Sequence, residues 1–563
     1  MAGKNIRKQN IIQLALLVAI LLTINILGSY LFTRIDMTAE KRYTLSESSK
    51  QITESLSDII YIKIYLDGEL PPGFRRLQNA TREMLDEFRI YAGDKIEYEF
   101  IDPSQVTDDK SRMDLYKQLA TKGLLPTNLE QSDKGGQSQK IIFPGAILSY
   151  RSREMPLQLL KNRIGNSPEE MLNISIENLE YEFCSAFRKI TLEKGTKIGF
   201  LIGQNEIISN RIGDAIKSLR EFYTVDTVGI YGQLHALDGF AALLIVGPES
   251  TFEEKDKFVL DQYIMSGGKV FWLINNVQMD MDSLTETTTS LALSMDLNLA
   301  DMLFRYGARI NGDLVMDLQA APISVVTGTI GNQPQQKLFP WYYFPLLQTE
   351  SPHPIVHNLN AVKGEFVSSV DTIESDGVQK TILLTSSKFG RIQMSPARVS
   401  LNILRDDPDP KLFSKRFIPV AVLLEGSFTS NFLNRIPEHL ANSPELNFKT
   451  RSVETSMIVA GDANLITNYI SQKGVPYPMG YDRYTGQSYG NRSFLMNCVD
   501  YLCGNKNILS LRSKEFKLRL LDPAKTENKS AIQWINMLLP VFIVGLFAFI
   551  FNLRKKQKYA RGL

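Results

Sequence analysis

The chain begins and ends with long apolar segments. Residues 11–32 read IIQLALLVAILLTINILGSYLF and residues 532–553 read IQWINMLLPVFIVGLFAFIFNL. Each is about long enough to cross a hydrocarbon layer of roughly 30 Å. The first is longer than the apolar core of a cleaved signal peptide, and no small-residue cleavage site follows it. The pattern therefore predicts two transmembrane helices, the first of them an uncleaved anchor.

Basic residues lie at the outer ends of both apolar segments. Lys4, Arg7 and Lys8 precede the first, and residues 554–561 carry a denser basic cluster after the second. Because positive charge near a span favours the cytoplasmic side, both termini are expected in the cytoplasm of a bacterium. The long segment between the spans is then periplasmic, anchored in the inner membrane.

Between the spans, the first folded region shows strand and helix patterns in alternation. A helix-like stretch at 46–56 and a β-rich run at 59–66 precede apolar residues at helical spacing, and 96–100 alternate as a strand. This is a βαβ unit, and a thioredoxin-like fold fits it. The loop at 67–74, DGELPPGF, contains no cysteine, which excludes thiol–disulfide exchange. The stretch QSDKGGQSQK at 131–140 is expected to be a flexible loop.

A second α/β region follows, with strands and helices in regular alternation. Its apolar strand runs are expected at 197–202, 225–228, 241–246 and 269–274. Thr251 and Glu254 have the spacing of a capping box, and Gly267-Gly268 should end the helix that they open. The alternation predicts a doubly wound parallel sheet, Rossmann-like or amidotransferase-like. Strand-like runs at 381–385, 418–424 and 456–460 either extend this sheet or form an appendage.

These patterns divide the chain into consecutive parts. They are a cytoplasmic N-terminus (1–10), a transmembrane helix (11–32), a thioredoxin-like region (33–190), a Rossmann-like domain (191–510), a linker (511–531), a transmembrane helix (532–553) and a basic cytoplasmic tail (554–563).

Composition narrows the class of protein. The 563 residues are 44% hydrophobic, so they can build more than one core, and the formal net charge of +2 gives no overall field that would gather nucleic acid. The three cysteines, Cys184, Cys498 and Cys503, are an odd number and too few for a disulfide framework. We interpret them as small buried core residues.

The loop Gly203-Gln204-Asn205-Glu206 follows the first strand of the second region. Ligands of open parallel sheets bind at strand carboxyl ends, so Glu206 is a candidate ligand contact, with a solvated turn carboxylate the simpler interpretation. The loop lacks GxGxxG, and GxxxxGK[ST] does not occur in the chain. ATP hydrolysis is therefore not expected. An amidotransferase-like hydrolase needs a cysteine at a strand end, and residues 197–280 contain none.

Metal and cofactor chemistry also lack support. His353 and His357 have a spacing that can hold zinc on a helix, but Pro352 and Pro354 disfavour that helix. The aspartates at 406–409 alternate with prolines in what is expected to be an exposed loop. We predict neither a metal site nor a cofactor.

Two groups of residues are candidates for binding other molecules. Trp341 and Tyr342, within the aromatic run FPWYYF, could form a ligand or partner surface, with packing between domains an equal alternative. Small or polar residues in the apolar segments could pack against helices of a partner in the membrane: Asn25, Ser29, Asn536 and Gly545.

Four segments, in this order, resemble the ABC-transporter auxiliary proteins, and within them the gliding-motility-associated substrate-binding proteins (GldG family) of the Bacteroidota. They are NLADMLFRYGARINGDLVMD (298–317), SPHPIVHNL (351–359), GDANLITN (461–468) and GNRSFLMNCVDYLCG (490–504). The chain departs from the family at the loop after the first strand, where relatives often have Gly-His-Gly-Glu and Gln204-Asn205 stand here.

The resemblance implies a non-catalytic subunit that works with a multispanning permease and a cytoplasmic ATPase in gliding motility. Such a subunit captures a solute or transmits permease movement. Two other classes stay open: a membrane-tethered hydrolase with an unrecognised site, and a static scaffold of the motility machinery.

Overall fold

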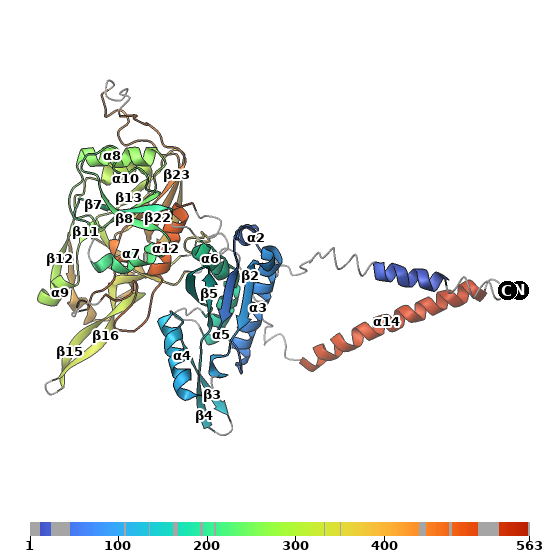
Figure 1. Cartoon of the computed structure of the whole chain (residues 1–563). Helices are drawn as coiled ribbons and strands as arrows, with labels where there is room; N and C mark the ends of the chain where they lie inside the picture. The colour runs from blue at the N-terminus through green and yellow to red at the C-terminus, as the bar shows by residue number, and fades with distance from the viewer. Residues whose placement is uncertain are drawn as a thin grey trace. The chain divides into compact units, whose positions relative to one another are not determined.

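A computed structural model describes residues 12–23, 45–504 and 529–560, with gaps in the middle range at 106–107, 134–135, 161–166, 192–194, 208–209, 331–332, 350, 358, 438–445, 472–473 and 475. The chain divides into two compact units, Met1–Glu515 and Phe516–Leu563. Figure 1 follows the chain from end to end, and the two units are described separately below.

The first sheet of the larger unit contains the expected βαβ motif. Strands β1 (Ile60–Ile64) and β2 (Ile96–Phe100) are parallel and are joined by helix α3 (Pro72–Ala92). Strands β5 (Gly145–Tyr150) and β6 (Arg153–Gln158) continue the sheet antiparallel, in the order β2-β1-β5-β6. The βαβ prediction is thus confirmed.

Helices bury one face of this sheet. They are α2 (Glu47–Glu54), α3, α5 (Pro168–Glu177) and α6 (Leu179–Thr191). Phe88 of α3 meets Phe187 of α6 edge-on, with ring centroids 5.1 Å apart, and Cys184 lies in the same core. Full burial of one such aromatic side chain stabilises the fold by about 1.5–3 kcal/mol.

The stretch at 131–140 is not the loop that its composition predicts. Strands β3 (Thr127–Asp133) and β4 (Gly136–Ile142) pair antiparallel across this stretch, after helix α4 (Asp109–Thr121). Most of its polar residues therefore belong to paired strands. Continuous backbone pairing outweighs side-chain composition here, and only 134–135 lie outside the described residues.

A seven-stranded sheet forms the centre of the second region. Its order is β19-β22-β23-β10-β9-β7-β8. The parallel strands are β7 (Lys197–Ile202), β8 (Thr224–Gly229), β9 (Ala242–Val246), β10 (Val270–Leu273) and β23 (Thr455–Ala460). Strand β22 (Pro419–Gly426) runs antiparallel to β23, and the edge strand β19 (Val378–Thr385) runs antiparallel to β22, so β22 alone opposes the direction of the other strands in this sheet. The late strands therefore extend the sheet, but the sheet is mixed and not wholly parallel.

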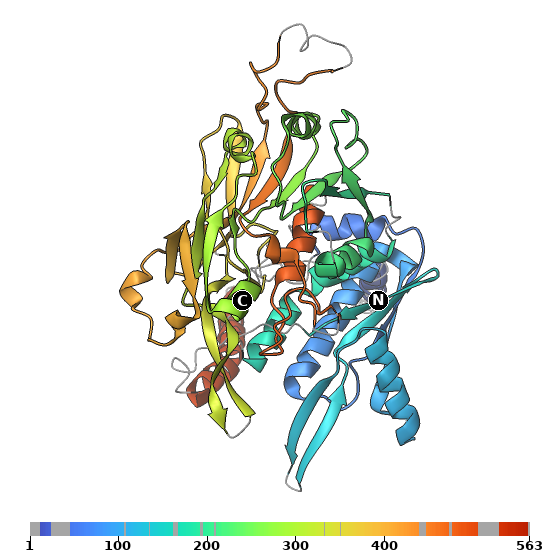
Figure 2. The same cartoon turned by 90° about the vertical axis from the view of Figure 1, so that its left-hand side faces the viewer.

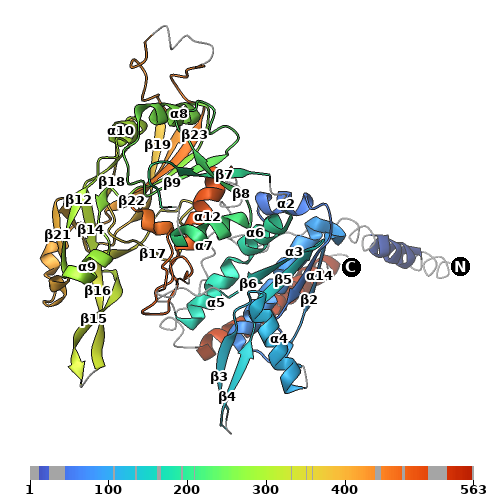
Figure 3. The same ribbon diagram turned by 60° about the vertical axis from the view of Figure 1, so that its left-hand side comes forward.

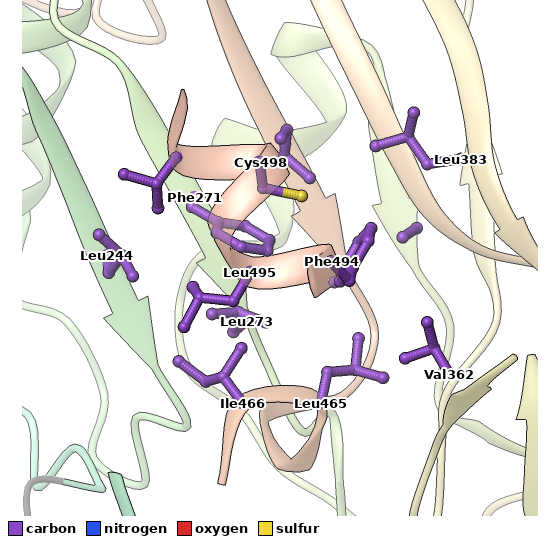
Figure 4. Packing of buried hydrophobic residues seen from close by; sticks show 14 of the residues in the cluster. Leu244, Phe271, Leu273, Val362, Leu383, Leu465, Ile466, Phe494, Leu495 and Cys498 are labelled. Carbon is purple, nitrogen blue, oxygen red and sulfur yellow. The ribbon is translucent and has the colours of Figure 1, made fainter. Parts of the chain in front are cut away.

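Helices cover both faces of this sheet (Figure 3). Helices α7 (Gly213–Arg220) and α12 (Asn491–Leu502) pack on one face, and α8 (Glu254–Met265) and α10 (Ala300–Tyr306) on the other. Figure 4 shows Phe494, Leu495 and Cys498 of α12 among Leu244 and Phe271 of the strands. Burial on both faces explains why these strands read as unbroken apolar runs.

The start of α8 differs from the prediction. Glu253 occupies the N-cap without a side-chain cap, and the Thr251 hydroxyl donates to the backbone oxygen of Asp296, 2.9 Å away. The capping box predicted for Thr251 and Glu254 is therefore wrong, because Thr251 instead ties this loop to a distant segment. The end of the helix agrees with the prediction, since Gly267 follows it with φ +96°.

An inserted β-rich region separates β10 from β22. Its elements are β11 (Val277–Gln278), α9 (Asp282–Thr287), β12 (Thr289–Ser294), β13 (Ala308–Ile310), β14 (Asp313–Asp317), β15 (Ala320–Ile330), β16 (Gln333–Leu347), β17 (Val362–Lys363), β18 (Val370–Thr372), β20 (Gly390–Met394) and β21 (Ala397–Ser400). Helix α10 and the edge strand β19 lie within the same span of sequence. Strands β15 and β16 form a narrow two-stranded ribbon (Figure 2).

The smaller unit contains helix α14 (Lys529–Ala560). Its segment Gln533–Gln557 is long and apolar enough to cross a membrane. At the other end of the chain, the described apolar helix Ile12–Thr23 is too short to span by itself, and the rest of 11–32 lies outside the described residues. Of the two predicted spans, the described residues thus contain one candidate.

Candidate functional site at the carboxyl edge of the sheet

The strand order places a topological switch point between β7 and β9. The chain leaves β7 to form β8 on one side and returns to form β9 on the other. Ligands of open α/β sheets bind outside the carboxyl ends of strands at such a point. Hydrogen bonds join the loops that follow β7 and β9 at this point. The backbone N–H groups of Glu249 and Ser250 both donate to the backbone carbonyl oxygen of Gln204, each at 3.0 Å.

The backbone at this point is strained. Asn205 after β7 has φ +57° and Tyr231 after β8 has φ +45°, a left-handed conformation that costs a non-glycine residue about 1–2 kcal/mol. Gly203 has φ +132°, and a Cβ there would lie 3.6 Å from the Tyr231 ring. The two strained loops therefore meet at Gly203. Strain of this kind concentrates at functional sites.

Gln204 is the most buried side chain of the loop, with 7% of its surface exposed. Its Nε2 donates to Asp256 Oδ2 at 2.9 Å, and the other oxygen, Asp256 Oδ1, accepts from the Gly232 N–H at 2.8 Å. These bonds fix the orientation of the amide. Gln204 Oε1 is left buried without a hydrogen-bond partner.

Glu206, like Gln204, has one side-chain atom that forms a hydrogen bond and a second that has no partner. Its Oε2 accepts from the Gln204 N–H at 2.9 Å, while its Oε1 is buried without a partner. Burial raises the pKa of Glu206, and the negative charge of Asp256 raises it further, although backbone N–H groups oppose both effects. At the rim, Asn205 Nδ2 donates to Glu249 Oε2 at 2.9 Å. The site is thus acidic and rich in hydrogen-bond acceptors.

We define the switch-point site as Gly203–Glu206 with Gly232, Glu249 and Asp256. The chemistry available to it is the acceptance of hydrogen bonds and the binding of positive charge. The described residues contain no group of three or more His, Cys, Asp or Glu side chains that could hold a metal ion. Of the predicted contacts, the structure places Glu206 here. Sequence reasoning missed Gln204 and Asp256 as site residues. Their only signal was position: Gln204 follows β7, and Asp256 lies on α8, the helix that follows β9.

The comparisons with known proteins identify the domain that carries this site. The profile of a family described as an ABC-type uncharacterized transport system matches residues 196–498. The chain belongs to this transport-system family. A second profile, for a domain of unknown function, matches residues 39–149.

The individual proteins and solved structures to which this family member is similar add little about its chemistry. An uncharacterized protein of Borreliella burgdorferi is 19% identical over 541 residues, which cover 93% of this chain and 94% of that protein. The mmIFT52 N-terminal domain is 13% identical, with TM-score 0.31, over 55% of this chain and 98% of that one. PurLQS from Thermotoga maritima is 12% identical, with TM-score 0.22, over 55% and 99%.

A second buried acid of this family member lies after β23. Asp462 is fully buried, and its two oxygens accept the N–H groups of Glu365 at 2.9 Å and of Asn464 at 2.7 Å. Burial raises the pKa of Asp462 to about 8. Since its bonds connect the loop after β23 to the segment around Glu365, we assign Asp462 a structural role. Its position directly after a buried strand was the signal that sequence reasoning overlooked.

The aromatic run on β16 lies in the interior. Trp341 is fully buried and Tyr342 is 7% exposed, with its ring centroid 5.5 Å from that of Phe413. Both belong to the core of the inserted β-rich region. Neither side chain is available to a ligand at the surface in this conformation, and packing accounts for both.

The cysteines and His353 have packing roles in the described structure. Cys184 and Cys498 are buried and Cys503 is half-buried, and none forms a disulfide. Burial raises the pKa of Cys503 to about 12 and raises those of the other two thiols as well. Thiolates are therefore scarce near neutral pH. The ring of His353 packs edge-on against Tyr501, with centroids 4.9 Å apart.

The candidate packing residues of the membrane helices are divided by the described ranges. Asn536 and Gly545 lie on α14 and are exposed within the smaller unit. Asn25 and Ser29 lie outside the described residues. Their role in the membrane stays a prediction.

Proposed function

We propose that this chain is a non-catalytic, membrane-anchored subunit of an ABC-type transport system, working with a separate permease and a cytoplasmic ATPase. The observation that carries the proposal is the family match over residues 196–498, which covers the seven-stranded sheet and the helices on both of its faces. The apolar segment Gln533–Gln557 supplies an anchor of sufficient length.

The non-catalytic part of the proposal rests on the chemistry of the site. The loop after β7 reads Gly203-Gln204-Asn205-Glu206 and has no glycine-rich phosphate cradle. The thiols of the three cysteines have raised pKa values, which disfavours a thiolate nucleophile. The full chain, purified in detergent, should therefore neither hydrolyse ATP nor catalyse thiol–disulfide exchange. Turnover that scales with the amount of the pure chain would contradict this part.

We also propose that the large unit is a periplasmic assembly in which a thioredoxin-like region precedes the Rossmann-like domain, and that a second anchor occupies residues 11–32. The strand order β2-β1-β5-β6, with the last two strands antiparallel, supports the thioredoxin-like assignment. The basic residues at 4–8 and 554–561 support cytoplasmic termini.

A role in gliding motility is the narrower proposal. It rests on the order of segments 298–317, 351–359, 461–468 and 490–504, which resembles the GldG family. Deletion of the gene in a gliding host should abolish spreading on agar, and expression of the full chain should restore it. Normal spreading of the deletion strain would contradict the gliding role while leaving the transport-subunit proposal intact.

A further inference from the structure

The switch-point site has an excess of hydrogen-bond acceptors. Gln204 Oε1 and Glu206 Oε1 are buried and unpartnered, on side chains two residues apart. A buried polar atom without a partner costs about 1–3 kcal/mol. Both unmatched atoms are oxygens, so the group that would satisfy them is a hydrogen-bond donor.

Two carboxylates of the site, those of Glu206 and Asp256, lie close together. The Asp256 carboxylate lies close enough to Glu206 to raise the pKa of Glu206, and Gln204 Nε2 bonds directly to Asp256. The partners of Asp256 are the amide of Gln204 and the N–H of Gly232, which are neutral donors. Glu249 at the rim likewise bonds the neutral amide of Asn205. The group that best completes the site is therefore both a donor and a cation.

We propose that the switch-point site binds an alkylammonium or guanidinium group through Gln204 Oε1 and Glu206 Oε1. A metal cation fits less well, because the carboxylates present do not form a group of three or more ligands. An alkylammonium group carries three N–H donors and a guanidinium group five, and each donor needs only one oxygen acceptor. Glu206 as a whole is half-buried, so part of its side chain is exposed to an incoming group.

The cation has two possible sources: a free amine or guanidine solute, or a Lys or Arg side chain of a partner protein. Both present the same chemistry to the site. The first makes the site a solute site, and the second makes it a docking contact. The experiment therefore has two arms.

In the first arm, isothermal titration calorimetry measures binding to the full chain in detergent. The ligands are Nα-acetyl-arginine amide, Nα-acetyl-lysine amide and Nα-acetyl-citrulline amide. Citrulline keeps the shape of arginine but is uncharged. The second arm purifies the tagged chain from native membranes and identifies the proteins that accompany it. Both arms compare the wild type with E206Q and with the control E454Q. Glu454 is exposed and directly precedes β23, so it lies at the amino end of that strand and away from the carboxyl ends that carry the site.

A solute site predicts binding of a cationic amide, no binding of the citrulline amide, and at least about tenfold weaker binding by E206Q alone. A docking contact predicts no small-molecule binding and the loss of one accompanying protein from E206Q but not from E454Q. Either result supports the proposal. The absence of both effects would overturn it.

E206Q should fold, because the amide removes the repulsion between Glu206 and Asp256. Its thermal midpoint should equal or exceed that of the wild type. If E206Q nevertheless unfolds, E249Q replaces it. Glu249 is exposed, so this change should preserve the fold, and it should weaken cation binding or partner recovery by a smaller factor. Unchanged binding and recovery in a folded E249Q would then also overturn the proposal.

Discussion

Lys257 of α8 is fully buried, and its surroundings explain how the fold tolerates a buried charge. Its Nζ donates to Asp301 Oδ1 at 2.9 Å and to Glu254 Oε1 at 2.9 Å. Asp301 also accepts from Asn431 and Arg435. Although partial burial raises the pKa of Asp301, these hydrogen bonds lower it overall, so the carboxylate stays charged. The network ties α8, α10 and the segment after β22 together.

Removal of Asp301 should therefore destabilise the sheet domain more than removal of an exposed acid. Asp301→Ala removes the more buried of the two carboxylates that bond Lys257, while Glu254 Oε1 at 2.9 Å and Asn298 Oδ1 at 3.3 Å remain, so the expected cost is about 1–3 kcal/mol. The matched control is Asp238→Ala, since Asp238 pairs with His235 at the surface and should contribute within about 0.5 kcal/mol. Thermal unfolding of the full chain measures both. Equal midpoints for the two variants would refute the stabilising role of the network.

Asp462 predicts a dependence of stability on pH. Its folded pKa of about 8 exceeds the unfolded value of about 3.9, so the folded state retains a proton that the unfolded state releases. The stabilising contribution is complete below about pH 4 and is lost as pH rises to about 8. The thermal midpoint should therefore decrease as the pH is raised from 5 to 8. In Asp462→Asn this decrease of the midpoint with pH should be smaller. An unchanged slope in that variant would mean that this carboxyl titrates normally.

The position of a functional residue could be predicted from the sequence only where the neighbouring residues along the chain determine it. Glu206 follows a strand that the sequence identifies, so its position at the sheet edge could be predicted. The partnership of Gln204 with Asp256 spans 52 positions and depends on strand order, which a single sequence does not specify. Trp341 and Tyr342 could not be assigned to surface or core, because aromatic residues serve both.

At the scale of elements, the long apolar strands were the most predictable features. Strands β7, β9 and β10 match the expected runs because burial on both faces leaves no polar residue in the interior of any of them. The antiparallel direction of β22 was not predictable, since direction depends on the connection and not on the strand's own residues. The β3–β4 hairpin was missed because pairing of polar strands leaves no apolar alternation to detect.

Helix α14 permits a test of the anchor. A charged residue near the centre of a membrane helix costs about 2.5–3.5 kcal/mol of insertion free energy. Val544→Arg lies near the middle of Gln533–Gln557 and should lower the fraction of chain whose C-terminal tail is membrane-protected. Val544→Leu is the matched control and should insert normally. Protease accessibility of the tail in isolated vesicles distinguishes them, and equal protection of both variants would argue against a span here.

At the scale of the whole molecule, the proposed topology rests on the basic residues that flank the two apolar segments. Reporter fusions after Lys8 and after Lys556 should be active on the cytoplasmic side. A reporter placed within residues 130–140 should be active only outside the cytoplasm, because the domain between the anchors is expected to be exported. Cytoplasmic activity of the middle reporter would contradict the proposed location.

Membership of an ABC-type transport complex can be tested by purifying the tagged full chain from native membranes. After mild cross-linking, quantitative mass spectrometry should show a multispanning permease and an ABC ATPase enriched with the chain in constant ratio. Both should be depleted when residues 533–557 are replaced by an unrelated apolar helix with the same flanking charges. Recovery of the chain without any permease or ATPase would contradict the account.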